Sequence, residues 1–245
     1  PRPRTLVANY NEAKNLDRSE LLSVSKLRTQ FHIGKQNYKA VDGVSIYAKK
    51  GACLGIIGES GSGKSVTALS IMGLVSSPPG IITGGYVNYK GSNLIHTNDQ
   101  ELQSLRGNKI SYVFQDPLSS LHPLYTVQKQ LEEAIKAHQP VSQEEVYQRS
   151  IELLKSVRIP NPEQRAKDYP HQLSGGMRQR VNIAMALAND PEIIIADEPT
   201  TALDVTVQAQ ILSLFRELTR ERGLAIIFIT HDFGVVSQIC DEVAV

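Results

Sequence analysis

The sequence predicts an α/β protein built on a parallel β-sheet, and three observations lead to this fold class. Four runs of strand length are apolar throughout: ACLGII (52–57), ISYVF (110–114), EIIIA (192–196) and LAIIFIT (224–230). Strands that are apolar on both faces are typical of a parallel sheet covered by helices on its two sides. A glycine or a polar residue follows each run directly. A glycine-rich loop also joins the first run to an apolar helical stretch, VTALSIMGL (66–74).

Length and composition indicate an ordinary globular protein. The chain has 245 residues, which is room for one large domain or two small ones. It is 41% apolar and 21% charged with a net charge of +1, so no basic excess points to nucleic acid as a partner. The longest apolar runs are too short to span a bilayer. We therefore expect a folded protein that neither binds nucleic acid nor crosses a membrane itself.

The residues at the two ends of the chain lead us to expect that it is part of a longer protein. Residues 1–20 are polar and lack the apolar core of a secretory signal, and we expect them to form a tail or linker. The last residues, DEVAV, lie in an apolar stretch, so we expect the C-terminus to be truncated. The two cysteines, Cys53 and Cys240, sit in apolar surroundings. Two buried, reduced thiols are expected there rather than a disulfide.

Two further regions complete the expected architecture. From residue 21 to about residue 50, β-rich runs separated by polar turns predict antiparallel strands. Between about residues 117 and 172 no β-rich run occurs. Apolar residues recur there at helical spacing, which predicts an inserted helical subdomain. The residues on these helical faces are Val127, Leu131, Ala134 and Ile135, followed by Val146, Leu153, Leu154 and Val157.

The glycine-rich loop, GESGSGKS (58–65), fits the phosphate-loop pattern and has the strand before it and the helix after it that this motif requires. Its glycines let the backbone N–H groups approach a β-phosphate at the start of a helix. Lys64 is expected to reach the β- and γ-phosphates, and Ser65 to offer its hydroxyl to Mg²⁺. The residues predicted to bind the nucleotide are Gly58, Ser60, Gly61, Ser62, Gly63, Lys64 and Ser65.

Two carboxylates follow the run IIIA directly. Asp197 and Glu198 could form a solvated acidic turn, but open α/β sheets bind their ligands just outside the carboxyl ends of the strands. We therefore expect Asp197 to hold Mg²⁺ through its water shell. Glu198 is expected to polarise the attacking water as a general base.

Gln115 and His231 follow the other two apolar runs in the same way. Each alone could be a simple polar cap at the end of a strand. A parallel sheet, however, brings the residues after all four runs to a single edge. We therefore expect Gln115 and His231 to lie beside the phosphates.

A second anion-binding turn stands in LSGGMRQR (173–180), where Ser174, Gly175 and Gly176 precede a helix. The alternative is an ordinary N-capped helix start. That alternative explains the serine but not two glycines, which lower helix stability. A chain with one phosphate loop has no evident need for a second.

The combined motifs closely resemble the ATP-binding cassette (ABC) family of ATPases. The phosphate loop, Gln115, LSGGM, IIIADE, ALD (202–204) and His231 occur in the family's order, and the resemblance extends from about residue 21 to residue 245. It implies an ATPase with a RecA-like parallel core, an N-terminal antiparallel β subdomain and the inserted helical subdomain. It also implies ATP and Mg²⁺ as cofactors.

The resemblance further implies a head-to-tail dimer of two cassettes, which gives the second turn a role. Ser174, Gly175 and Gly176 would bind the γ-phosphate of the ATP held by a partner cassette. Gln115 would sense Mg²⁺ and face the transport partner, and Asp204 would link the two ATP sites. His231 would contact the γ-phosphate and position Glu198. An aromatic residue would stack on the adenine, and Phe31 is expected there with Tyr38 as the alternative.

The residues around these motifs resemble one branch of the family, the ATPases of oligopeptide and dipeptide importers. The stretches QDPLSSLHP (115–123), YPHQLSGGMRQRVNIAMAL (169–187) and DEPTTALDVTVQAQIL (197–212) carry this likeness, although His122 and Phe233 stand where Asn and Leu are usual. The branch also serves nickel, metallophore and glutathione uptake. The resemblance implies a peripheral protein on the cytoplasmic face of the inner membrane. Its partners would be a second ATPase subunit, two transmembrane permease subunits and, indirectly, an extracellular solute-binding protein.

Two other functions stay open at this point. A soluble cassette ATPase could power a multi-protein assembly, although such proteins often carry long coiled-coil insertions that the short gap between Gln115 and Leu173 does not accommodate. A cassette could also bind ATP only as a structural clamp, but Lys64, Asp197 and Glu198 are intact. The resemblance favours a heterodimer over a homodimer, and the sequence does not name the transported solute.

Overall fold

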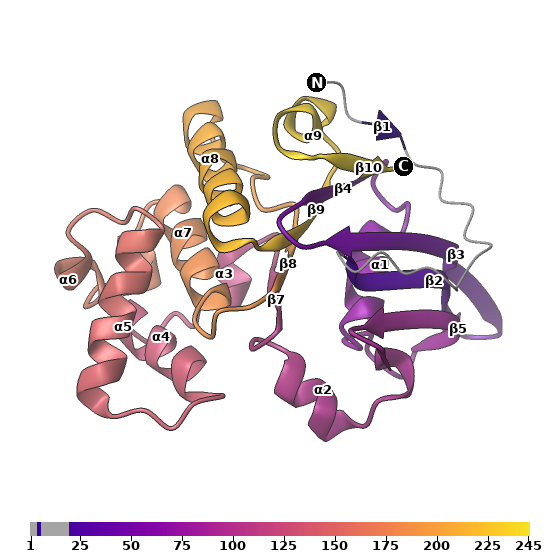
Figure 1. Ribbon diagram of the computed structural model, residues 1–245, viewed down its shortest axis with the longest axis horizontal. Helices are drawn as coiled ribbons and strands as arrows, with labels where there is room; N and C mark the ends of the chain where they lie inside the picture. The colour runs from indigo at the N-terminus through magenta and orange to yellow at the C-terminus, as the bar shows by residue number, and fades with distance from the viewer. Residues whose placement is uncertain (1–3, 6–19) are drawn as a thin grey trace.

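The computed structural model describes residues 4–5 and 20–245, and two β-sheets form its centre (Figure 1). All the strands of the first sheet are parallel, in the order β1-β10-β4-β9-β8-β7. They are β1 (Arg4–Thr5), β4 (Cys53–Ile57), β7 (Ile110–Val113), β8 (Ile193–Asp197), β9 (Ala225–Thr230) and β10 (Glu242–Ala244). The predicted fold class is confirmed, and the four apolar runs form β4, β7, β8 and β9.

The central strands β4, β8 and β9 are largely apolar because each face of the parallel sheet packs against its own core. In β8, Ile194 and Ala196 point into a core shared with α7 (Gly175–Ala186) and α8 (Val205–Arg222). Ile193 and Ile195 point to the other side, toward α1 (Lys64–Ile71) and the second sheet. Alternate residues of a strand face opposite ways, so both sets must be apolar when both faces are covered.

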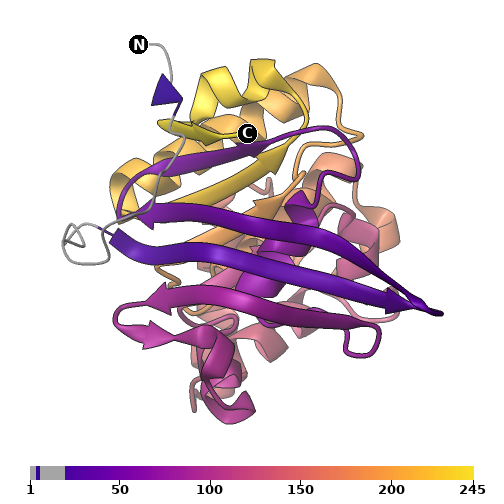
Figure 2. The same ribbon diagram turned by 90° about the vertical axis from the view of Figure 1, so that its right-hand side faces the viewer.

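The second sheet is antiparallel and has the order β3-β2-β5-β6 (Figure 2). Its strands are β2 (Glu20–Ile33), β3 (Gln36–Lys49), β5 (Gly80–Tyr89) and β6 (Ser92–Asn93). The antiparallel strands predicted before residue 50 are present as two long strands with bulges between them. The sequence prediction did not include β5 and β6, because glycines and a threonine interrupt the apolar pattern of GIITGGYVNY.

Helices cover both faces of the parallel sheet, with α7 and α8 on one side and α1 on the other (Figure 1). The remaining α-helices are α2 (Asp99–Leu105), α3 (Pro117–Ser120), α4 (Val127–Lys136), α5 (Gln143–Ser156), α6 (Pro162–Arg165) and α9 (Phe233–Ile239). Two short 3₁₀ helices, η1 (Leu94–His96) and η2 (Pro170–Gln172), complete the structure. Within the described ranges, no helix has both the length and the apolarity needed to cross a bilayer.

Residues 117–172 contain helices and connecting turns, as the sequence predicts. Side chains that were expected on one helical face, such as Val127, Leu131 and Val146, are fully buried in the core shared with α7. The predicted tail, residues 1–20, lies almost wholly outside the described residues. The exceptions are Arg4 and Thr5, which pair with β10 at the edge of the parallel sheet, and Glu20, which is the first residue of β2.

The two cysteines lie together, although they are 187 positions apart in the sequence. Both are free thiols, and the Sγ of Cys53 lies 3.7 Å from the Sγ of Cys240. Cys53 is buried at the start of β4, and Cys240 follows α9 with partial exposure. The absence of a disulfide agrees with the expectation of reduced thiols.

The packing between the sheet and α8 predicts where the fold is most sensitive to substitution. Phe228 of β9 is fully buried and packs edge-on against Phe215 of α8, with ring centroids 5.7 Å apart. Phe228→Ala should lower the free energy of unfolding by about 3–5 kcal/mol, because it leaves a cavity in this core. Phe233→Ala is the matched control: that ring is 70% exposed, and its loss should change stability by less than about 0.5 kcal/mol. Urea denaturation measures both values, and equal losses would contradict this packing.

Candidate nucleotide-binding site

The phosphate-loop sequence forms the connection between β4 and α1, as predicted. Lys64 is buried, and its Nζ donates hydrogen bonds to the backbone oxygens of Gly58 and Glu59, both at 2.8 Å. The N–H of Ser62 donates to the same Glu59 oxygen at 3.2 Å. The lysine therefore lies inside the curve of its own loop, where a phosphate would replace carbonyl oxygens as its hydrogen-bond acceptors.

Gly63 shows why the last glycine of this loop is required. Its φ is +94°, which L-residues rarely adopt, and it is the N-cap of α1. A Cβ atom at this position would lie 2.2 Å from the backbone oxygen of Ala40 in β3. The loop thus packs directly on the antiparallel sheet, and only a residue without a side chain fits between them.

Asp197 ends β8 next to the first turn of α1. Its side chain is buried, and both of its oxygens accept hydrogen bonds. Ser65 donates to Oδ1 at 3.0 Å, and the hydroxyl of Tyr112 donates to Oδ2 at 2.9 Å. Burial and the nearby Asp197 carboxylate raise the pKa of Tyr112 well above its usual range, so the phenol stays protonated and donates. A carboxylate beside a serine hydroxyl is the donor set that Mg²⁺ prefers.

Glu198 is the next residue, and its backbone has an unusual conformation. Its φ is +45°, a strained value for a residue with a side chain. The side chain is held by three groups: Gln115 and Thr201 each donate to Oε2 at 2.9 Å, and Nδ1 of His231 lies 3.3 Å from Oε1. Residues after three different strands thus converge on one carboxylate.

These residues share a cavity of about 990 Å³ at the carboxyl ends of the parallel strands. Its volume and its backbone N–H groups suit a nucleotide with several phosphates. The predicted site residues that line it are Gly58, Ser60, Gly61, Gly63, Lys64, Ser65, Gln115, Glu198 and His231. Ala40, Thr201 and Phe233 also line it and were not predicted. The convergence of the four strand ends at one edge is therefore observed.

The candidates for the adenine contact lie elsewhere. Neither Phe31 nor Tyr38 is among the described residues that line the cavity. Phe31 is partly buried beside Gly80, its strand partner in β5. Tyr38 is half exposed, and its hydroxyl donates to Gln36 at 2.6 Å. The stacking of an aromatic ring on adenine stays a prediction.

The second anion-binding turn also lies outside the cavity. Ser174 caps α7 by accepting a hydrogen bond from the N–H of Met177 at 3.3 Å, and Asp204 caps α8 in the same way through Val207 at 2.9 Å. Gly176 permits the close packing of these two helices, since a Cβ there would lie 2.5 Å from Val207. Gly175, by contrast, is exposed and has room for a Cβ. The exposed N-terminus of α7 therefore does not line the cavity beside the phosphate loop of its own chain.

Comparison with known proteins identifies the family. The pattern that defines the ABC transporter family matches residues 41–201. A probable peptide ABC transporter ATP-binding protein of Sinorhizobium fredii is 50% identical over 225 residues, which cover 92% of this chain and 67% of that protein. The chain belongs to the ABC transporter family. The resemblance inferred from the sequence is confirmed, and ATP with Mg²⁺ is the ligand that the family brings to the phosphate loop.

Two other relatives extend this result to one branch and to the fold. The oligopeptide transport ATP-binding protein OppD of Bacillus subtilis is 48% identical over 227 residues, covering 93% of this chain and 63% of that protein. This cassette thus spans about two thirds of the length of both transport relatives. A dimeric ATP-binding cassette bound to ADP and Pi superposes with a TM-score of 0.79 and 32% identity, covering 91% of this chain and 96% of that one.

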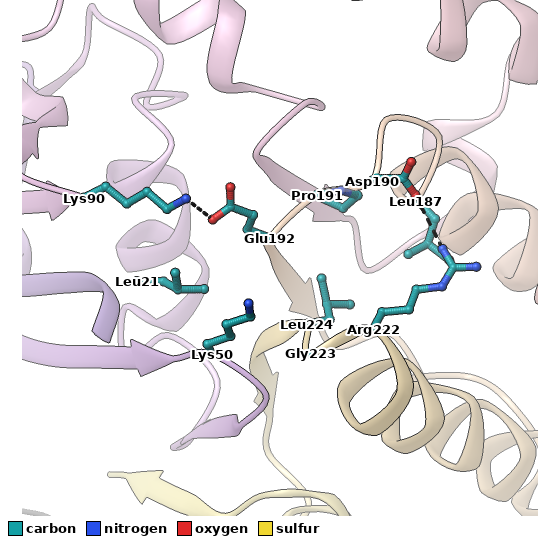
Figure 3. Close-up of a pocket in the computed structure, with 10 residues that line it drawn as sticks. All are labelled: Leu21, Lys50, Lys90, Leu187, Asp190, Pro191, Glu192, Arg222, Gly223 and Leu224. Carbon is teal, nitrogen blue, oxygen red and sulfur yellow. Dashed lines mark ion pairs between the residues drawn. The ribbon is translucent and has the colours of Figure 1, made fainter. Parts of the chain in front are cut away.

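Another cavity of the cassette, of about 680 Å³, lies at the opposite, amino-terminal end of the strands (Figure 3). Two salt bridges lie in its walls. The Nζ of Lys90 is 2.5 Å from Oε2 of Glu192, and Nη1 of Arg222 is 3.8 Å from Oδ1 of Asp190. It lacks a glycine-rich loop, and ligands of open α/β sheets bind at the other end of the strands. We therefore place the nucleotide in the larger cavity.

The loop geometry predicts different results for two neighbouring glycines. Gly61 and Gly63 both have φ near +90°, so alanine at either position costs about 1–2 kcal/mol of backbone strain. Only Gly63→Ala also collides with the Ala40 oxygen, since a Cβ on Gly61 would meet no described atom within 4 Å. Gly63→Ala should therefore lower the thermal unfolding midpoint and the affinity for an ATP analogue more than Gly61→Ala does. Differential scanning fluorimetry with and without the analogue measures both, and equal effects would contradict the observed contact.

Proposed function

We propose that this chain is the ATP-hydrolysing subunit of a prokaryotic ABC importer for peptides or related small solutes. The observation that carries the proposal is the arrangement around Glu198, whose carboxylate lies at the phosphate-loop cavity between Gln115 and His231. A binding site that served only as a clamp would have no need for a carboxylate held in this way. The names of the two transport relatives support peptides as the solute class.

Hydrolysis would proceed by in-line attack of water on the γ-phosphate, with most of the catalysis supplied by positioning and charge stabilisation. Lys64 would bind the β- and γ-phosphates, and Glu198 would accept a hydrogen bond from the water and orient it. His231 would hold Glu198 and contact the γ-phosphate. Ser65, Gln115 and Asp197 would hold Mg²⁺, which neutralises charge on the phosphates when bound.

A second cassette would complete each ATP site. The N-terminus of α7, with Ser174, Gly175 and Gly176, does not line the cavity at the chain's own phosphate loop and would bind the ATP of a partner. Asp204, which caps the adjacent helix α8, would link the two sites. The dimeric cassette with ADP and Pi is a solved precedent for such pairing. We favour a heterodimer of two related ATPases over a homodimer.

The permease would dock beside the helical subdomain. A cavity of about 510 Å³ lies between β7 and α3 on one side and α4 and α7 on the other, with Phe114 and Met185 in its wall. Because Gln115 follows Phe114 directly, a permease segment bound in this cavity would contact the loop that reaches Glu198. We propose residues 21–245 as one ATPase domain with the helical subdomain at about residues 117–172.

This docking would place the protein on the cytoplasmic face of the inner membrane, bound to two permease subunits. An extracellular solute-binding protein would act on it only through the permease. The alternative, a soluble cassette that powers a multi-protein assembly, receives less support, because the two relatives that cover more than nine tenths of this chain are named for transport.

The assignment of the base predicts a specific loss. Glu198→Gln removes the negative charge that polarises water but keeps hydrogen-bonding groups for Gln115 and Thr201. ATP hydrolysis should fall by about 10²-fold or more, while ATP binding remains and an ATP-bound dimer accumulates. Phosphate release and size-exclusion chromatography with ATP measure the two effects. Hydrolysis at the parent rate would overturn the role of Glu198.

The transport function predicts particular partners. The tagged full-length protein, extracted from native membranes in mild detergent, should copurify with two permease subunits and a second cassette. Mass spectrometry identifies these partners and distinguishes a heterodimer from a homodimer. Recovery of soluble partners alone would contradict transport while leaving the ATPase intact.

A further inference from the structure

Tyr112 connects the site at Asp197 with the cavity on the helical side, and no motif in the sequence gives it a role. It lies in β7, the edge strand of the parallel sheet next to β8. Its hydroxyl donates to Oδ2 of Asp197 at 2.9 Å. Its ring lies 4.5 Å from the ring of Phe114, tilted by 40°. The hydroxyl thus faces the metal site while the ring packs beside a second aromatic residue.

The carboxylate of Asp197 needs such a partner. The terminal torsion of an aspartate is broad, so hydrogen bonds decide how its oxygens are oriented. Ser65 and Tyr112 are the two side chains of the described part of the chain that hydrogen-bond to it. Ser65 is itself expected to bind the metal, which leaves Tyr112 as the donor with no second task. Partners of this kind around a metal ligand typically change metal affinity 10–100-fold when removed.

Phe114 supports the tyrosine from the other side. Tyr112 and Phe114 are both among the residues that line the cavity of about 510 Å³ beside α3 and α7, and Phe114 is 42% exposed. A segment that filled this cavity would therefore contact both residues. The same tyrosine that holds Asp197 is thus part of the surface where the permease is proposed to dock.

We propose that Tyr112 is a positioning residue: its hydroxyl fixes Asp197 for the metal–nucleotide complex, and its ring, held by Phe114, makes this orientation sensitive to the occupant of the adjacent cavity. The proposal deepens the proposed function and rests on it for the role of Asp197. Tyr112 does not line the nucleotide cavity, so it would act through the carboxylate of Asp197.

The test measures metal binding rather than turnover. The probe is Mn²⁺, followed by electron paramagnetic resonance with the purified chain and a non-hydrolysable ATP analogue. Tyr112→Phe removes only the hydroxyl and should weaken Mn²⁺ binding about 10-fold, with unchanged affinity for the analogue in the absence of metal. Tyr86→Phe, a hydroxyl loss at a tyrosine that is 63% exposed on β5, should bind Mn²⁺ as the parent does.

A double-mutant cycle tests the contact with Phe114. Phe114→Leu should weaken Mn²⁺ binding about 3-fold in the parent and have no effect in the Tyr112→Phe background, because residues that act through one group are not additive. If Tyr112→Phe failed to fold, Phe114→Leu, which keeps the hydroxyl, would carry the test alone. Parent-like Mn²⁺ binding by Tyr112→Phe, or additive effects, would overturn the proposal. A parent chain that bound neither the analogue nor Mn²⁺ would instead refute the proposed function.

Discussion

The parallel register of β4, β9, β8 and β7 is the constraint on which the rest of the structure depends. Because these strands run the same way, the residues that follow them meet at one edge, and four separate stretches of sequence become one site. The apolar cores on both faces of the sheet keep the strands in this register. A one-residue shift of β8 would turn buried isoleucines toward the wrong core and displace Asp197.

Around this edge, the local backbone is strained or unusually close-packed where the chemistry requires it. Gly63 fits against the Ala40 oxygen, and Glu198 has a positive φ. Such conformations persist only where the surroundings over-determine them. At Glu198 these surroundings are its hydrogen bonds to Gln115 and Thr201 and the backbone bond from its N–H to Ile229. The fold thus holds the Glu198 carboxylate in position through hydrogen bonds within the chain itself.

Much of this site could be predicted from sequence, because strand-length apolar runs and the residues that directly follow them are local signals. The phosphate loop, Asp197 and Glu198 belong to this class. Tyr112 does not, since within ISYVF it reads as one more residue of a buried strand, and its partner Asp197 is 85 positions away. The pairing of Cys53 with Cys240 and the place of Ala40 in the cavity depend on tertiary contacts in the same way. The second anion-binding turn, residues 174–176, is visible in sequence, but the ATP that we propose it binds is held by a second cassette.

The central claim is that ATP binds at the carboxyl edge of the sheet and is enclosed by a second cassette. The most direct measurement is an experimental structure of the full-length protein with ATP and Mg²⁺. We expect the phosphates to lie in the loop at residues 58–65 and the metal to lie beside Ser65 and Asp197. We expect the γ-phosphate to contact Ser174 of a second cassette. Phosphates bound in the cavity at the opposite end of the strands, or a γ-phosphate contacted by the chain's own Ser174, would contradict the central claim.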